Sequence, residues 1–280
     1  MPAPGRPLYR VAFGGTVALA LGLGFGRFAF TPLLPMMQAD AGVTILSGSW
    51  LAAGNYLGYL LGALAGVRWR LESPFIIRVG LLTVALTTLA MGVTTDHLAW
   101  LLLRALAGGA TACILVATSA WTLARLALSG QNRLIAMVFG GVGVGIVVAG
   151  TLVLAAMAAG LRSSETWVIL GLVALAATGA SWNTLLREAK RPDGQPERPA
   201  VWRRAELWSI YGRARLVVAC YGAFGFAYII PATFLPAAAR QVVPDPLLFG
   251  WSWPLFGVAG ALSTLAAGQL ADRWSDRDIW

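Results

Sequence analysis

The chain has 280 residues, of which 58% are hydrophobic and only 12% are charged. Soluble domains carry about 25% charged residues, so this composition excludes a soluble globular protein. The formal net charge of +9 would suit a nucleic-acid-binding protein if the chain were soluble, but the charges lie mostly in short turns between apolar segments. We therefore expect the lipid bilayer as the main partner and no nucleic acid.

Eight apolar segments, separated by short polar or charged turns, follow one another along the chain. They are Val11–Met37, Trp50–Val67, Pro74–Thr94, Leu98–Leu123, Leu134–Leu161, Thr166–Leu186, Leu216–Ala239 and Leu248–Ala271. A membrane-spanning helix needs about 20 residues, and an unpaired backbone group in lipid costs several kcal/mol. The pattern therefore predicts an all-α membrane protein. The first segment is too long for the core of a signal peptide, and we interpret it as a retained helix.

Basic residues are distributed unevenly between alternate turns. If the N-terminus is cytoplasmic, the inner turns hold most arginines, for example Arg125 and Arg133, whereas the outer turns hold only Arg162 and Arg240. This asymmetry predicts a cytoplasmic N-terminus. Because Lys190 is the single lysine, the composition indicates a GC-rich bacterial genome. We expect a multi-pass protein of the bacterial inner (plasma) membrane.

One long connection divides the chain. Residues 188–213 are rich in proline and arginine and contain Trp208 and Tyr211 near their end. We interpret this stretch as a cytoplasmic linker. It separates an N-terminal bundle of six helices, residues 1–187, from helices 7 and 8 of an incomplete C-terminal bundle, residues 214–280.

The two parts contain an internal repeat. The segment Phe25–Pro32 aligns without gaps on Phe224–Pro231, with phenylalanine, glycine and proline matched. The first two segments thus correspond to the last two, as in two parallel halves related by an axis along the membrane normal. Because the second repeat stops after its second helix, we expect an incomplete fragment. We also expect a monomer.

Small residues recur every four positions on two segments. The members are Gly54, Gly58, Gly62 and Gly66 on the second segment and Gly260, Thr264 and Gly268 on the eighth. Such ridges let helix backbones approach closely. Two interpretations stay open: simple tight packing, or smooth faces on which helices slide.

Several motifs together resemble the major facilitator superfamily. The run GRFAFTPLLP from Gly26, followed by NYLGYLLG from Asn55, is similar to the YbfB/YjiJ-type branch of this superfamily. An arginine followed four residues later by glycine, a glycine-rich fifth segment and a charged turn after the eighth segment also resemble family signatures. The residues that the resemblance marks for coupling or conformational change are Arg104, Gly108, Gly141, Gly145, Gly150, Asp272, Arg273 and Arg277.

The resemblance implies a major facilitator fold and a secondary active transporter that works by alternating access, without a cofactor. Arg104 stands where the family has an arginine tied to proton coupling, so protons are a candidate coupling ion. Ile146 stands where the glycine-rich signature of exporters has a proline.

Apart from Arg78, near the start of the third segment, Arg27 and Arg104 are the two charges inside the apolar segments. A central arginine costs about 2.5–3.5 kcal/mol on insertion scales and should face a cavity or a partner. Arg104 lies near a helix start, where its side chain could reach the headgroups, whereas Arg27 lies in the middle of its helix. Pro32 and Pro35 follow Arg27 and are expected to loosen the helix and free carbonyls.

A guanidinium is a planar fork of donors that matches a carboxylate, so we predict a small organic anion as the solute. The alternative is that Arg27 bonds to backbone carbonyls at a bend of its own helix. The predicted substrate-binding residues are Arg27, Thr31, Asn55, Tyr56, Tyr59 and Tyr228.

Two other classes of protein were weighed against a transporter. An intramembrane enzyme is disfavoured because the single histidine, His97, lies in a turn and no carboxylate falls within an apolar segment. Cys113 and Cys220 form no metal cluster and are expected to be small buried core residues. A non-transporting membrane sensor, or an inactive truncated remnant with the same fold, remains open.

Overall fold

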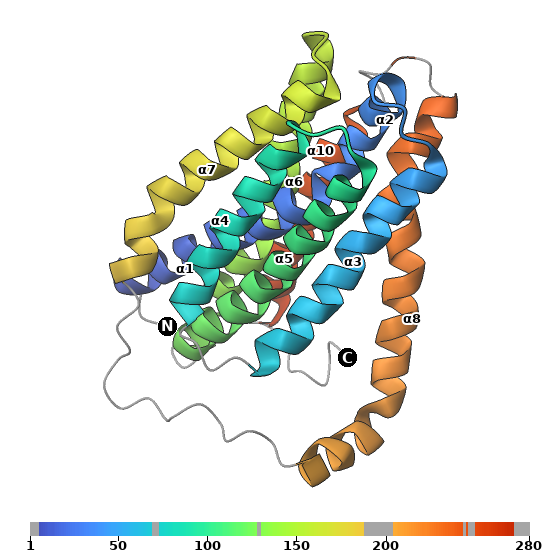
Figure 1. Ribbon diagram of the computed structural model, residues 1–280. Helices are drawn as coiled ribbons and strands as arrows, with labels where there is room; N and C mark the ends of the chain where they lie inside the picture. The colour runs from blue at the N-terminus through green and yellow to red at the C-terminus, as the bar shows by residue number, and fades with distance from the viewer. Residues whose placement is uncertain are drawn as a thin grey trace.

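The computed structural model describes residues 6–68, 73–127, 130–187, 204–242, 245 and 250–271. The elements are α1 (Arg6–Leu19), η1 (Ala20–Phe28), α2 (Phe30–Asp40), α3 (Ile45–Arg68), α4 (Ser73–Met91), α5 (His97–Leu126), α6 (Asn132–Ala158), α7 (Ser163–Arg187), α8 (Arg204–Val242) and α10 (Ser252–Ala271). The predicted all-α membrane fold is confirmed. The helices pack side by side as an elongated bundle, with α7 on one flank and α8 on the other (Figure 1).

Within the described residues, five helical stretches are long and apolar enough to cross a membrane. They are Leu8–Asp40, Ser73–Met91, His97–Leu123, Asn132–Ala158 and Ser163–Trp182. The other predicted segments lie in α3, α8 and α10, so each predicted apolar segment coincides with a helix or, for the first, with consecutive helical elements.

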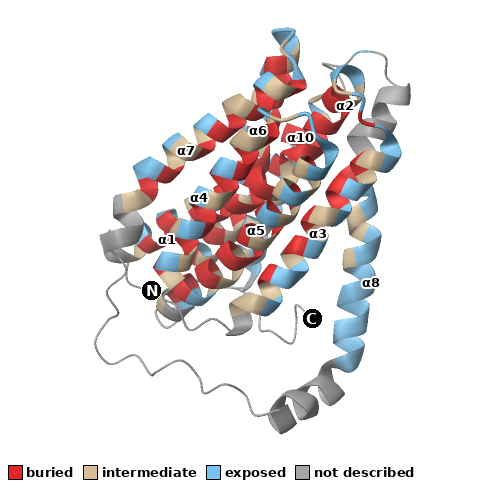
Figure 2. Ribbon diagram, viewed as in Figure 1, coloured by how far each residue is buried: buried red, intermediate tan, exposed pale blue. Residues whose placement is uncertain are grey.

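The first helix occupies the centre of the bundle. In its most apolar window 83% of the residues are buried, against 39–56% for the other four spans. Glycines make this possible: a Cβ at Gly24 would stand 2.5 Å from the backbone of Gly145, and a Cβ at Gly26 would overlap the Thr111 hydroxyl. The buried interior surrounds this helix in Figure 2. At these two glycines the central helix therefore touches its neighbours directly, and no larger side chain would fit there.

The glycine ridge of α3 packs on α5, a partner that the sequence did not identify. A Cβ at Gly58 would overlap the Ala105 carbonyl oxygen, and one at Gly62 would overlap the carbonyl of Gly109. Gly108 on α5 meets the Asn55 carbonyl in the same way. The two backbones therefore touch with no side chain between them, which supports the interpretation as tight packing.

The glycines of α6 face two ways. Gly141 and Gly145 lie against the carbonyls of Thr16 and Ala20 on the central helix. Gly150 faces the opposite partner, α10, where a Cβ would stand 3.1 Å from Pro254 Cδ. One glycine-rich helix thus packs closely against both the central helix and α10.

The predicted ridge of α10 is only partly correct. A Cβ at Gly260 would meet no atom within 4 Å, and Thr264 donates a hydrogen bond to its own helix at Gly260 O (2.7 Å). Gly268 does meet α6, and a Cβ at Gly257 would stand 2.8 Å from the Gly143 carbonyl oxygen. The residues of α10 that contact α6 include Gly257, Ala261 and Gly268. They are separated by four and seven residues, so the contact face combines three-residue and four-residue steps, whereas the predicted ridge used four-residue steps only.

α8 is attached to the bundle less closely. It begins at Arg204, so the last residues of the predicted linker, 204–213, are helical; they follow the prolines and are rich in helix-forming Ala, Leu, Glu and Arg. The remainder of that linker lies outside the described residues. Most of residues 215–227 are exposed (Figure 2), including Cys220, so the prediction that this thiol is buried is wrong. Cys113 on α5 is buried, as predicted.

Replacing Gly58 by alanine tests the contact between α3 and α5. We expect Gly58→Ala to destabilise the protein by about 1–3 kcal/mol, since the added methyl group meets a backbone oxygen that cannot move aside. The measurement is unfolding of the detergent-purified protein. Gly179→Ala on α7, where a Cβ would meet nothing within 4 Å, is the matched control. Equal stability of the two variants would contradict the close approach.

Candidate functional site

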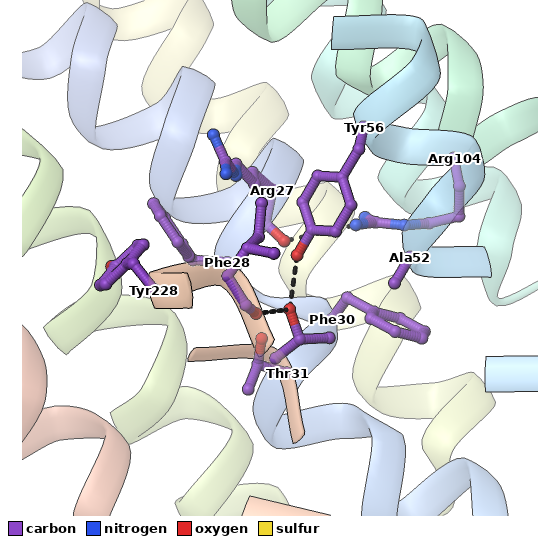
Figure 3. Close-up of a pocket in the computed structure, with 10 residues that line it drawn as sticks. Arg27, Phe28, Phe30, Thr31, Ala52, Tyr56, Arg104 and Tyr228 are labelled. Atoms are coloured by element: carbon purple, nitrogen blue, oxygen red, sulfur yellow. Dashed lines mark hydrogen bonds between the residues drawn. The ribbon is translucent and has the colours of Figure 1, made fainter. Parts of the chain in front are cut away.

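A small cavity lies where the central helix, α3, α5 and α8 meet. Its lining comes from the end of η1 and the start of α2 (Arg27, Phe28, Phe30, Thr31), from α3 (Ala52, Tyr56), from α5 (Arg104) and from α8 (Tyr228, Ile229, Thr233). Figure 3 shows Arg27 and Tyr56 on one side of α8, with Tyr228 carried by α8 itself. The site therefore joins the N-terminal bundle to the first helix after the linker.

Arg104 forms the buried wall of this site. Its Nη1 donates to the Gly26 carbonyl (3.1 Å) and its Nη2 to the Arg27 carbonyl (3.3 Å). The guanidinium lies over the Phe30 ring, 4.8 Å from its centroid. Asn55 Nδ2 donates to the same Gly26 carbonyl (3.2 Å) and to the Arg104 carbonyl (2.9 Å). Arg104 and Asn55 thus fix the backbone of the central helix at one point.

The sequence explains why carbonyls need outside donors here. Residues Ala20–Phe28 form a π-helix, in which each carbonyl accepts from the fifth residue onward. For Arg27 that residue is Pro32, which has no N–H. The predicted loosening is present, but it lies on the N-terminal side of the prolines, while α2 contains both Pro32 and Pro35 in helical form.

The expectation that Arg104 could reach the headgroups is wrong. The residue is only 3% exposed, and Figure 3 shows its side chain pointing toward the backbone of the central helix. In lipid an orphaned carbonyl costs several kcal/mol, so the freed carbonyls attract the guanidinium more strongly than the headgroups do. The alternative considered for Arg27, bonding to carbonyls of the first helix, is thus the role of Arg104.

Arg27 has different surroundings. Its guanidinium carbon lies over three aromatic rings, 5.3 Å from the centroid of Phe28, 5.2 Å from Tyr56 and 5.1 Å from Tyr59. Each such contact contributes about 0.5–2 kcal/mol. Among the described residues, the Nε atom of Arg27 is buried without a hydrogen-bond partner. Ring faces hold the cation, and its donors are not consumed by an acidic side chain in the described part of the chain.

Tyr56 connects the bundle to α8. Thr233 Oγ1 donates to the Ile229 carbonyl of its own helix (2.7 Å), which uses its only proton. The short hydrogen bond between Tyr56 and Thr233 therefore has the tyrosine hydroxyl as donor. Figure 3 shows the Tyr56 ring pointing from α3 toward α8. This bond joins two residues that line the site, one on α3 and one on α8.

The site is electropositive. None of its lining residues in the described part of the chain is acidic, whereas two are arginines. The described acidic side chains lie at or beyond helix ends: Asp40 ends α2, Asp96 caps α5, and Glu165 is in the first turn of α7. An uncompensated pair of guanidinium groups in a low-dielectric interior attracts anions. No cluster of metal-binding side chains occurs among the described residues.

The structure brings most of the predicted binding residues together. Arg27, Thr31, Tyr56 and Tyr228 line the cavity. Tyr59 contacts Arg27 from outside the lining, and Asn55 bonds to backbone rather than facing the cavity.

The predicted coupling residues are more scattered. Arg104 lies in the cavity wall, and Gly108 lies one helical turn further along α5 against α3. The α6 glycines lie between the central helix and α10, away from the cavity. Asp272, Arg273 and Arg277 lie outside the described residues.

Sequence reasoning missed Phe28, Phe30, Ala52, Ile229 and Thr233. The internal repeat aligns Ile229 with Phe30, each two residues before the matched prolines Pro231 and Pro32, but no motif marked either residue for binding. The hydrogen bond of Tyr56 across to α8 has no signal in the sequence.

A bundle of long apolar helices around a polar central site defines a multi-pass helical membrane protein. Residues 19–279 match the family described as uncharacterised MFS-type transporter YbfB, and the chain belongs to this family of the major facilitator superfamily. It is accordingly a membrane transporter, and the resemblance found in the motifs is confirmed. No curated protein matches the chain.

The role of Arg104 can be tested by removing its charge. We expect Arg104→Met to destabilise the fold by about 1–3 kcal/mol, because the Arg27 carbonyl loses its donor while Asn55 still serves Gly26. Unfolding in detergent measures the change. Leu102→Met, at a position 57% exposed on the same helix, is the control. If the two variants unfold alike, the carbonyl bonds do not stabilise the fold.

Proposed function

We propose that the chain is a secondary transporter that moves a small organic anion by alternating access. The observation that carries this proposal is the Arg27 guanidinium, which is held by three ring faces at an electropositive cavity and has a buried Nε without a protein acceptor. A guanidinium cannot be neutralised near physiological pH, so its charge is compensated by an anion. A carboxylate fits its donor geometry best.

The position of the cavity supports alternating access. Its walls come from the N-terminal bundle and from α8, which are joined by the hydrogen bond between Tyr56 and Thr233. The space left for the centre of a water molecule is about 10 Å³, room for a single water. An organic solute thus requires α8 to move away from α3, and the same movement opens the site.

We also propose that the protein lies in a bacterial inner membrane with its N-terminus in the cytoplasm, and that it acts as a monomer. The distribution of arginines between alternate turns supports the orientation. Protons are the proposed coupling ion, from the position of Arg104 in the family motif. No described titratable carboxylate lines the cavity, so in this proposal the proton is not carried by a lining residue of the described chain.

Exchanging Arg27 for lysine tests the anion site. In a thermal-stabilisation screen of carboxylates, sugars and amines, we expect carboxylates to stabilise the wild-type protein and the other two classes to have no effect. Arg27→Lys should weaken the response at least about tenfold, or about 1.4 kcal/mol, because lysine lacks the bidentate fork. Arg133→Lys, exposed at the start of α6, is the matched control. Stabilisation by sugars or amines that survives Arg27→Lys would reject the proposal.

Single cysteines test the proposed orientation. In a background with Cys113→Ala and Cys220→Ala, we expect Thr95→Cys, in the exposed turn before α5, to react with an impermeant maleimide added to intact cells. Arg133→Cys should react only after the cells are permeabilised. Labelling of Arg133→Cys in intact cells, with Thr95→Cys protected, would reverse the orientation.

A further inference from the structure

We propose that the solute is a monocarboxylate with a flat apolar body and without an amino group, and that Tyr56 is the second donor to its carboxylate. This inference rests on the proposed function and narrows it. Three observations carry it. They are the number of guanidinium groups that a ligand can bind, the aromatic and non-acidic residues that line the described cavity, and the hydrogen bond of Tyr56 to Thr233.

The cavity offers one guanidinium to a ligand. Both Nη atoms of Arg104 already donate to the backbone carbonyls of Gly26 and Arg27, and its guanidinium carbon lies over the Phe30 ring. Its Nε, like that of Arg27, has no hydrogen-bond partner among the described residues, but Arg104 keeps no second nitrogen outside those backbone bonds with which to form a bidentate pair. Arg27 makes only ring contacts among the described residues. A second carboxylate on the solute would therefore be buried without a cation, which is strongly unfavourable in a low-dielectric site.

The cavity offers nothing to an ammonium group. None of the residues that line it in the described part of the chain is acidic. A zwitterionic amino acid would place its ammonium beside Arg27 and Arg104, at the cost of like-charge repulsion and desolvation. The chemistry of the walls thus selects against amino acids and amines.

The walls favour a flat apolar body. Phe28, Phe30, Tyr56 and Tyr228 line the cavity, and the Trp253 ring lies beyond Phe28 at a centroid distance of 6.3 Å. The Arg27 guanidinium carbon lies 5.1–5.3 Å from three ring centroids. A carboxylate that approaches the edge of this guanidinium forms a bidentate pair. A planar body attached to that carboxylate then lies between ring faces, where offset stacking is favourable.

Tyr56 completes the recognition. Its hydroxyl donates to Thr233 in the closed cavity, since the Thr233 proton is already used by Ile229. When α8 moves away, this donor is released on the same ring whose centroid lies 5.2 Å from the Arg27 guanidinium carbon. The hydroxyl is then available to a carboxylate oxygen, so the solute takes the place of Thr233.

Binding of benzoate, phthalate, L-phenylalanine and acetate to the purified full chain tests this inference. These probes present one carboxylate on a ring, two carboxylates, a zwitterion, and a carboxylate without a body. We expect benzoate to bind at least tenfold more tightly than each of the other three. Arg27→Lys should weaken benzoate at least tenfold and Tyr56→Phe about threefold to tenfold, whereas Tyr9→Phe, exposed at the start of α1, should have no effect.

The outcomes separate the two proposals. If phthalate or L-phenylalanine binds as tightly as benzoate and Arg27→Lys weakens both, the anion site stands and the solute class is wrong. If acetate equals benzoate, the apolar body is not recognised and the class is again wrong. If Tyr56→Phe binds benzoate like Tyr9→Phe, the tyrosine is not a donor. If no probe binds in an Arg27-dependent manner while sugars or amines do, the proposed function itself fails.

Discussion

The bond between the Arg104 guanidinium and the carbonyls of Gly26 and Arg27 is the constraint on which the rest of the site depends. A π-helical stretch is followed by Pro32, which has no N–H to offer the Arg27 carbonyl five residues before it. Lipid offers no donor in its place. Arg104 supplies the missing donor from α5, and Asn55 reinforces it from α3. Three helices are thereby held at one point, and Arg27, on the same turn, is directed away from the backbone toward the aromatic rings.

Two arginines in similar apolar surroundings therefore have opposite roles, and their sequence context ranks them only in part. Depth along the helix predicts that Arg27 cannot reach the headgroups, and its guanidinium carbon lies over three aromatic rings. Depth fails for Arg104, because the direction of that side chain depends on a carbonyl of another helix that needs a donor. This carbonyl belongs to Arg27, 77 residues away in the chain. Prolines indicate that some carbonyls are freed, but which ones depends on the π-helical register, which the positions of the prolines do not determine.

The helical architecture is far easier to predict than the site. Segment lengths follow from the thickness of the bilayer, so all of the apolar segments coincide with helices. Glycine spacing predicts that α3 approaches another helix closely, but not that this helix is α5. The contact face of α10 depends on how two helices are rotated about their axes, which spacing alone leaves open. Tyr56 was recognisable from its motif, but its bond to Thr233 joins residues on opposite sides of the linker and arises only from packing.

The packed glycines also limit which mutations the gene can accept. Every amino acid that a single-nucleotide change can substitute for glycine carries a Cβ atom. At Gly58, Gly108 and Gly145 that atom would overlap a carbonyl of the neighbouring helix. Missense change at these codons therefore has no conservative option, whereas a leucine codon on the lipid-facing surface can change to that of another apolar residue at little cost. The interior of this bundle is accordingly far less open to gradual sequence drift than its surface, even though both are composed almost entirely of small or apolar residues.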